Sequence, residues 1–142
     1  MTPQQIQAVQ STWKMVTPIA DTAANLFYAQ LFVLDPKLAP MFSADMTEQR
    51  RRLMTMIGVA VTGLTRIETI VPALRNLGAR HVDYGVRDEH YDTVGAALLW
   101  TLERGLGPAF TEEVREAWTA AYTLVATTMK EGAARAMVRL AA

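Results

Sequence analysis

The 142-residue sequence predicts a single all-α domain of six to eight helices. Apolar residues recur every three or four positions along most of the chain, which is the spacing of one helix face. Proline, glycine and capping residues separate these stretches. Alternating strand patterns are weak, and the hairpin dipeptides Asn-Gly and Asp-Gly do not occur. The length suits one domain, residues 1–142, with its own hydrophobic core.

The first helix is expected to begin at the N-terminus, where Thr2 can cap it, Pro3 suits its first turn and Gln5 has the spacing of a capping box. Its apolar stripe consists of Ile6, Val9, Trp13 and Val16. Pro18 ends or restarts this helix. A second helix, roughly residues 19–34, is apolar almost all round, which indicates burial on several sides.

Asp35-Pro36 breaks the second helix, and a short helical turn leads on to Phe42. Asp45 or Thr47 can cap a third helix that runs to about Gly63. One face of this third helix consists of Gln49, Leu53, Met56 and Ala60. A polar amide therefore stands at the end of an apolar stripe.

The fourth helix carries a histidine on its apolar face. Thr69 and Pro72 mark its expected start, and Gly85 its end. The face consists of Ile70, Leu74, Leu77, His81 and Tyr84. Burying an imidazole costs free energy unless the ring finds a partner, which can be a backbone carbonyl, a carboxylate or a metal.

Two more helices complete the chain. The first starts near Asp88-Glu89, ends at Gly105, and presents Tyr91, Val94, Leu98 and Leu102 on one face. Thr111 caps the last helix, for which Gly132 is the expected stop. Its apolar face consists of Val114, Trp118, Tyr122, Val125 and Met129. The tail from about residue 133 is expected to be frayed helix or disordered.

Composition excludes several classes of function. The 14 basic and 14 acidic residues give no basic surplus for nucleic acid or an anionic membrane, and no apolar run approaches the ~20 residues that span a bilayer. The start of the chain lacks a secretory signal, so we expect a cytoplasmic protein. The absence of cysteine excludes disulfides, iron–sulfur clusters and cysteine-ligated zinc.

Common catalytic motifs are also missing. The glycines form no phosphate-binding loop, Ser11 and Ser43 lie in no nucleophile motif, and the acidic residues form no pair. What remains is His81 on an apolar face, with Tyr28 and Gln49 on other helices, which is the inventory of a haem pocket. The residues alone leave two interpretations open: an iron ligand, or a core histidine bonded to a carbonyl in a domain without a cofactor.

Several segments, in order and at matching spacing, resemble the single-domain bacterial haemoglobins, which are related to the globin module of flavohaemoglobins. They are Leu26–Phe32, Pro40–Phe42, Gln49–Met54, Leu77–Val86 and His90–Leu99, with support from Ala117-Trp118 and Tyr122. The resemblance covers nearly the whole chain and implies a globin fold with haem b in its pocket.

The resemblance also implies a role for individual residues. His81 matches the proximal ligand, which binds iron through Nε2, and Phe42 matches the phenylalanine that stacks on the haem. Tyr28 and Gln49 match the distal pair that donates hydrogen bonds to the gas. Leu53 and Met56 wall the distal pocket, and Tyr91 matches the tyrosine of a proximal hydrogen-bond network.

The implied function is reversible, tight binding of dioxygen, with nitric oxide and carbon monoxide as further ligands, in gas storage, delivery or buffering. The alternative is a nitric oxide dioxygenase, which needs a separate reductase because the 142 residues hold no flavin or nicotinamide domain. The proximal glutamate of flavohaemoglobins matches Ala133 here. Glu131 can replace it only if the helix shifts, since two residues rotate a helix by about 200°.

Overall fold

The structure is a computed structural model that describes residues 1–141, with side chains described for residues 1–138. The described chain holds six α-helices and four short 3-10 helices and no strand, which confirms the predicted all-α class. The α-helices are α1 (Pro3–Val16), α2 (Ala20–Leu34), α3 (Thr47–Thr62), α4 (Ile67–Asp83), α5 (Asp88–Leu106) and α6 (Glu112–Ala141). The 3-10 helices are η1 (Thr17–Ile19), η2 (Pro36–Met41), η3 (Gly63–Arg66) and η4 (Gly107–Ala109).

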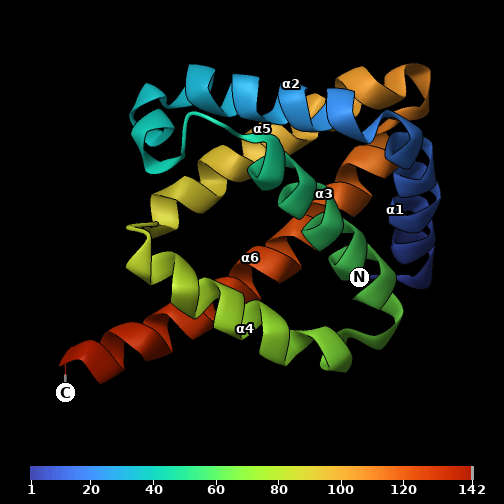
Figure 1. Ribbon diagram of the computed structural model, residues 1–142. Coiled ribbons are helices and arrows are strands. Elements are labelled where there is room, and N and C mark those ends of the chain that lie inside the picture. Colours follow the sequence, from blue (N-terminus) through green and yellow to red (C-terminus); the bar gives the residue numbers. More distant parts are fainter. Residues whose placement is uncertain (142) are drawn as a thin grey trace.

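The long helix α6 connects two parts of the fold, because α1 packs against one part of it and α4 against another. Helix α2 packs against α5 and, less extensively, against α3. Figure 1 shows α3 and α4 meeting at η3 and spreading apart away from it, in front of α5 and α6. The described residues of α3 and α4 hardly touch each other. The two helices therefore form the sides of an open wedge.

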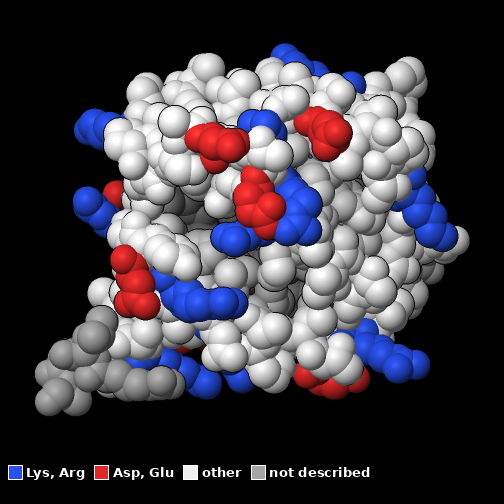
Figure 2. All heavy atoms as spheres, in the orientation of Figure 1, with Lys and Arg blue, Asp and Glu red and all other residues white. Residues whose placement is uncertain are grey.

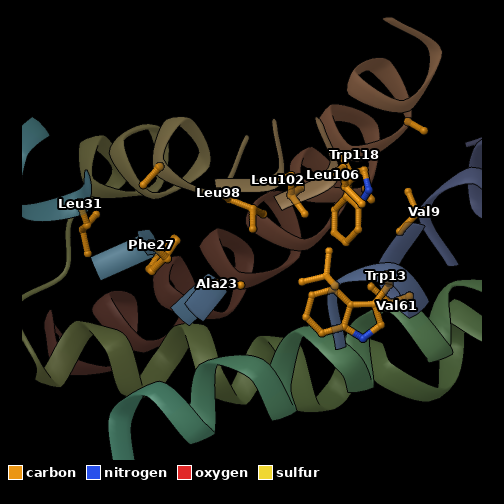
Figure 3. Close-up of a cluster of buried hydrophobic side chains, with 14 of the residues drawn as sticks. Val9, Trp13, Ala23, Phe27, Leu31, Val61, Leu98, Leu102, Leu106 and Trp118 are labelled. Atoms are coloured by element: carbon orange, nitrogen blue, oxygen red, sulfur yellow. The ribbon is translucent and has the colours of Figure 1, made fainter. Parts of the chain in front are cut away.

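The main hydrophobic core lies between α1, α2, α5 and α6 (Figure 3). Its tryptophans, Trp13 of α1 and Trp118 of α6, have ring centroids 6.1 Å apart. Inside this core the Trp118 Nε1–H donates to the buried Thr12 hydroxyl over 2.9 Å. A second cluster joins α4, α5 and α6 and consists of Ile70, Leu74, Tyr91, Ala126 and Met129. This second cluster underlies the helix that carries His81.

Most predicted helix ends are confirmed by local hydrogen bonds. The Thr2 hydroxyl and the Gln5 side chain form the capping box of α1. At the start of α3 the N-cap residue is Met46 rather than Asp45 or Thr47, and the Asp45 side chain accepts from the Thr47 backbone N–H over 3.0 Å. Thr111 accepts from the Val114 backbone N–H at the start of α6. The bonded residues are at most three positions apart, so these contacts can be predicted from neighbouring residues in the sequence.

The fourth helix differs from the prediction at its start, and its apolar face is one residue shorter than predicted, while the predicted stop at Gly85 is confirmed. It begins at Ile67 rather than at Thr69 or Pro72, because the 3-10 helix η3 leads directly into it. Pro72 lies inside α4. At the other end Tyr84 is 65% exposed and does not belong to the apolar face. The helix has ended at Asp83, and Gly85 at φ 83° turns the chain away.

Gly132 does not stop the last helix, since α6 continues to Ala141, and the predicted frayed tail is helical up to that residue. Ala142 lies outside the described residues. Gly132 and Gly78 instead allow α4 and α6 to cross closely: a Cβ on Gly132 would overlap the Arg75 carbonyl, and one on Gly78 would overlap the Met129 carbonyl. Each glycine faces rigid backbone of the other helix.

Gly78→Ala is therefore expected to destabilise the protein by about 2–3 kcal/mol, since overlap with backbone must be relieved by separating the helices. Gly105→Ala is the matched control, because its new methyl would meet only the Ile19 side chain at 3.5 Å, an ordinary contact. That control should be neutral or stabilising by about 0.5–1 kcal/mol. Urea unfolding of the three proteins measures both changes, and equal stability of the two variants would contradict the close crossing.

Among the described residues, Thr47–Asp83 is long and apolar enough to cross a membrane, with a window of mean hydropathy 1.4. This finding differs from the expectation that no apolar run approaches the length that spans a bilayer. In the fold this stretch is α3, η3 and α4, and only 28% of the window is buried. Its apolar residues are divided between the main core, which includes Val61 and Leu64, and the second cluster, which includes Ile70 and Leu74.

Candidate functional site

The candidate site is the cleft between α3 and α4. Figure 2 shows this face hollowed, with both basic (blue) and acidic (red) side chains around the hollow. The predicted face of α3 is half-buried along its length, at Gln49, Leu53, Met56 and Ala60. His81 on α4 is also half-buried. The cleft thus has mainly apolar walls and a titratable ring on one side.

One side of the cleft brings Tyr28 and Gln49 together from different helices. The Gln49 Nε2–H donates to the Tyr28 hydroxyl oxygen over 3.1 Å. Burial raises the pKa of the Tyr28 phenol, while the Gln49 bond and nearby Arg50 lower it by less. The phenol therefore keeps its proton at neutral pH. Because its oxygen already accepts from Gln49, its own O–H remains free to donate elsewhere.

Aromatic rings hold the Tyr28 side chain in place. The Phe42 ring, at the end of η2, lies edge-on to Tyr28 with centroids 5.5 Å apart. Phe32 contacts both rings, at 6.1 Å from Tyr28 and 5.6 Å from Phe42. Phe32 was not among the predicted site residues, although it stands one helical turn after Tyr28 and the spacing could have indicated it.

The other side of the cleft presents His81. Its Nδ1 lies 2.7 Å from the Leu77 carbonyl oxygen, one turn back on α4. A carbonyl only accepts, so Nδ1 carries the proton and Nε2 keeps its lone pair. Burial lowers the pKa of His81, the Leu77 bond raises it by less, and Arg80 lowers it further. The ring is therefore neutral at pH 7, in the form that binds a metal through Nε2.

His90, the other histidine, has a different task. Its Nδ1 accepts from the Arg87 backbone N–H over 2.9 Å, which closes the first turn of α5. This leaves His81 as the histidine of the cleft.

Tyr91 and Glu131 make no hydrogen bond to His81 in the described structure. The Tyr91 hydroxyl is buried and has no partner among the described residues, although the ring belongs to the second hydrophobic cluster, against which Leu77 also packs. The Glu131 carboxylate pairs with Arg75 over 3.2 Å and is exposed. The acceptor next to His81 is therefore a neutral carbonyl rather than a carboxylate.

The unpartnered Tyr91 hydroxyl predicts an unusual pair of stabilities. Tyr91→Phe should leave the free energy of unfolding of the haem-free protein unchanged or raise it by about 1 kcal/mol, because no bond is lost. Tyr122→Phe is the control, since the Tyr122 hydroxyl donates to the Tyr91 carbonyl over 2.5 Å and its loss should cost about 1–2 kcal/mol. Denaturant unfolding measures both, and a larger loss for Tyr91→Phe would contradict the assignment.

The residues of the cleft fit a haem group. A flat apolar macrocycle needs apolar walls, its iron needs one neutral imidazole, and the opposite face needs a few donors. Leu53, Met56 and Phe42 supply apolar surface, His81 supplies Nε2, and the Tyr28–Gln49 pair supplies donors.

Comparison with known proteins agrees with this geometry. Residues 25–129 match the family profile described as Globin. A neuroglobin from Danio rerio is 29% identical over 141 residues, covering 89% of each chain. A bacterial globin from Campylobacter jejuni is 28% identical with a TM-score of 0.84, covering 94% of this chain and 97% of the other.

A further solved structure shares the fold at lower identity. It is an engineered carbene transferase from Rhodothermus marinus, described as a putative nitric oxide dioxygenase. It is 22% identical, with a TM-score of 0.89 over 100% of this chain and 99% of the other. The profile match extends from within α2 to within α6 and includes both sides of the cleft. The chain belongs to the globin family.

Proposed function

We propose that this globin holds haem b in the cleft between α3 and α4 and binds dioxygen reversibly at a five-coordinate iron. Membership of the globin family implies a haem group and diatomic gas ligands. The observation that carries the finer proposal is the His81 ring, whose Nδ1 proton is engaged by Leu77 while Nε2 is free to ligate. When bound, the haem supplies an iron atom with one open position for a gas.

The chain's residues on the opposite side select and retain the gas. Tyr28 and Gln49 each have a hydrogen to donate, and their mutual bond fixes both side chains before the gas arrives. Phe42, Leu53 and Met56 make that side apolar and limit the access of water. In such a dry setting a hydrogen bond to a polarised ligand is stronger than in water.

The open position follows from the residues available. His90 caps α5, and the residue that the resemblance assigns to the gas-binding side is the amide Gln49, a weak iron ligand. We therefore expect the ferrous protein to be five-coordinate, and the same arrangement admits nitric oxide and carbon monoxide.

An absorption spectrum tests the proposal directly. The protein, purified or reconstituted with haem, should show a Soret band that shifts on reduction with dithionite and again on addition of carbon monoxide or dioxygen. Failure to take up haem at all would overturn the proposal and make His81 a core histidine.

The surroundings of His81 favour gas binding over turnover as a nitric oxide dioxygenase. A carboxylate next to Nδ1 would make the imidazole more electron-donating, but Leu77 offers a neutral carbonyl and Glu131 is engaged by Arg75. Rapid mixing of the dioxygen-loaded protein with nitric oxide, with and without a cellular reductase, separates the two functions. One stoichiometric reaction supports binding, whereas many turnovers with reductase would establish the enzyme.

A further inference from the structure

A second cavity, of about 690 Å³ and largely open to solvent, lies against another face of α3. Its α3 residues are Thr55, Gly58, Val59 and Thr62. At 100° per residue, these positions are centred about 140° around the helix from the face that carries Gln49 and Leu53. The remaining walls come from α1, η3 and the start of α4. This cavity is therefore separate from the cleft that faces His81.

Trp13 brings a hydrogen-bond donor to this cavity. The side chain is only 8% exposed, and its Nε1–H has no hydrogen-bond partner among the described residues. It faces α3, where a Cβ on Gly58 would lie 3.5 Å from Nε1 (Figure 3 shows the indole beside the green helix). Trp118, by contrast, satisfies its Nε1–H with Thr12. Because Nε1 is not among the buried side-chain atoms that lack a partner, the N–H reaches the cavity and can donate to an acceptor there.

Arg66 supplies the charge. It is the one charged residue among those that line the cavity, it is exposed, and it pairs with no carboxylate among the described side chains. Val59 and Ile70 give the same cavity apolar walls. A ligand that matches the Trp13 donor, the Arg66 charge and the apolar walls has acceptor oxygens, one negative charge and an apolar body. The volume falls within the usual range for small-molecule sites.

We propose that this cavity binds a small amphipathic carboxylate, with its carboxylate on Arg66 and the Trp13 indole N–H and its hydrocarbon chain along Val59 and Ile70. A single guanidinium matches the single charge of a carboxylate better than the double charge of a phosphate monoester. Gly58 keeps the space in front of the indole open, because any longer side chain at that position would enter it.

Octanoate is the probe, and the indole N–H signals of the ¹⁵N-labelled protein are the readout. The haem-loaded protein is used in its reduced carbon monoxide form, which is diamagnetic. The Trp13 signal should shift saturably, while the signals of Trp100 and Trp118 stay in place. Arg66→Gln should weaken binding by about tenfold or more, because a charge-assisted bond is lost. Lys14→Gln is the matched control, since Lys14 lies beside Trp13 in sequence but does not line the cavity, and it should bind normally.

Two further arms make the test decisive. Gly58→Leu should abolish the Trp13 shift by filling the cavity, and Gly58→Ala, whose methyl makes an ordinary contact with the indole, should weaken it while keeping the fold. 1-Octanol has the same chain without the charge and should bind about tenfold or more weakly than octanoate. An unmoved Trp13 signal, equal responses to both probes, or unchanged binding in Arg66→Gln would overturn the proposal. So would an octanoate effect confined to the Soret band, which would place the probe in the haem cleft.

Discussion

Replacing His81 with alanine is expected to abolish stable haem binding and the Soret band that comes with it. His81 is the histidine of the cleft, and its geometry leaves Nε2 as the free nitrogen. Loss of a group that only orients a metal ligand costs about 10–100-fold in metal affinity, so loss of the ligand itself should cost at least about 100-fold. Titration of the haem-free protein with haem, followed at the Soret maximum, measures the change.

His90→Ala is the matched control, because it removes the other histidine and disturbs only the first turn of α5. It should bind haem as the unchanged protein does. His81→Gly adds a positive test: free imidazole fills the space of the lost ring and should restore the band. A His81→Ala protein that is folded by circular dichroism and keeps the unaltered spectrum would show that another residue ligates the iron.

The parts of the fold that could be predicted are those specified by neighbours in sequence. The capping box of Thr2 and Gln5 is complete within four residues. The break at Asp35-Pro36 and the turn at Gly85 depend on the backbone preferences of proline and glycine. Helix faces follow from spacing alone, which is why most of the predicted apolar stripes are buried or half-buried.

The two errors at helix ends have different causes, a crossing helix at Gly132 and a preceding 3-10 turn at Pro72. Glycine is a residue type that commonly follows the end of a helix, but Gly132 lies inside α6, where the backbone of α4 passes against it at Arg75. Proline is common in the first turn of a helix, but α4 begins directly after η3, so Pro72 lies inside the helix. No local pattern reports that another helix crosses at a given position.

The two sides of the site also differ in whether their contacts are local in sequence. The bond from His81 to Leu77 spans one helical turn, so the interpretation as a carbonyl-bonded histidine could be made from spacing, and the structure shows that this bond is compatible with a free Nε2. The Tyr28–Gln49 bond joins residues 21 positions apart and depends on how α2 packs on α3. The residues alone indicated Tyr28 and Gln49 as separate pocket candidates, and the family resemblance indicated that they act as a pair. The cavity beside Trp13 depends on three separate segments, and nothing in the sequence indicated it.

Replacing Tyr28 with phenylalanine is expected to raise the dioxygen dissociation rate by about tenfold to a hundredfold. The substitution keeps the ring among Phe32 and Phe42 and removes only the hydroxyl, so packing should be preserved. A hydrogen bond to a charged or strongly polarised acceptor contributes about 1.5–3 kcal/mol, and each 1.4 kcal/mol is a factor of ten. Carbon monoxide accepts hydrogen bonds weakly, so its dissociation rate should change little. Stopped-flow and flash-photolysis kinetics measure the two rates, with the exposed Tyr84→Phe as the matched control.

A double-mutant cycle with Gln49→Leu then separates direct donation from positioning. Because the Gln49 amide donates to the Tyr28 oxygen, Gln49→Leu removes one donor and also frees the tyrosine to rotate. The two substitutions should therefore be non-additive, by about 0.5–3 kcal/mol in the dissociation barrier. Strict additivity would mean that each side chain acts on dioxygen independently of their mutual bond. An unchanged dioxygen rate in a normally folded Tyr28→Phe protein would remove Tyr28 from the binding site and leave Gln49 as the donor to test.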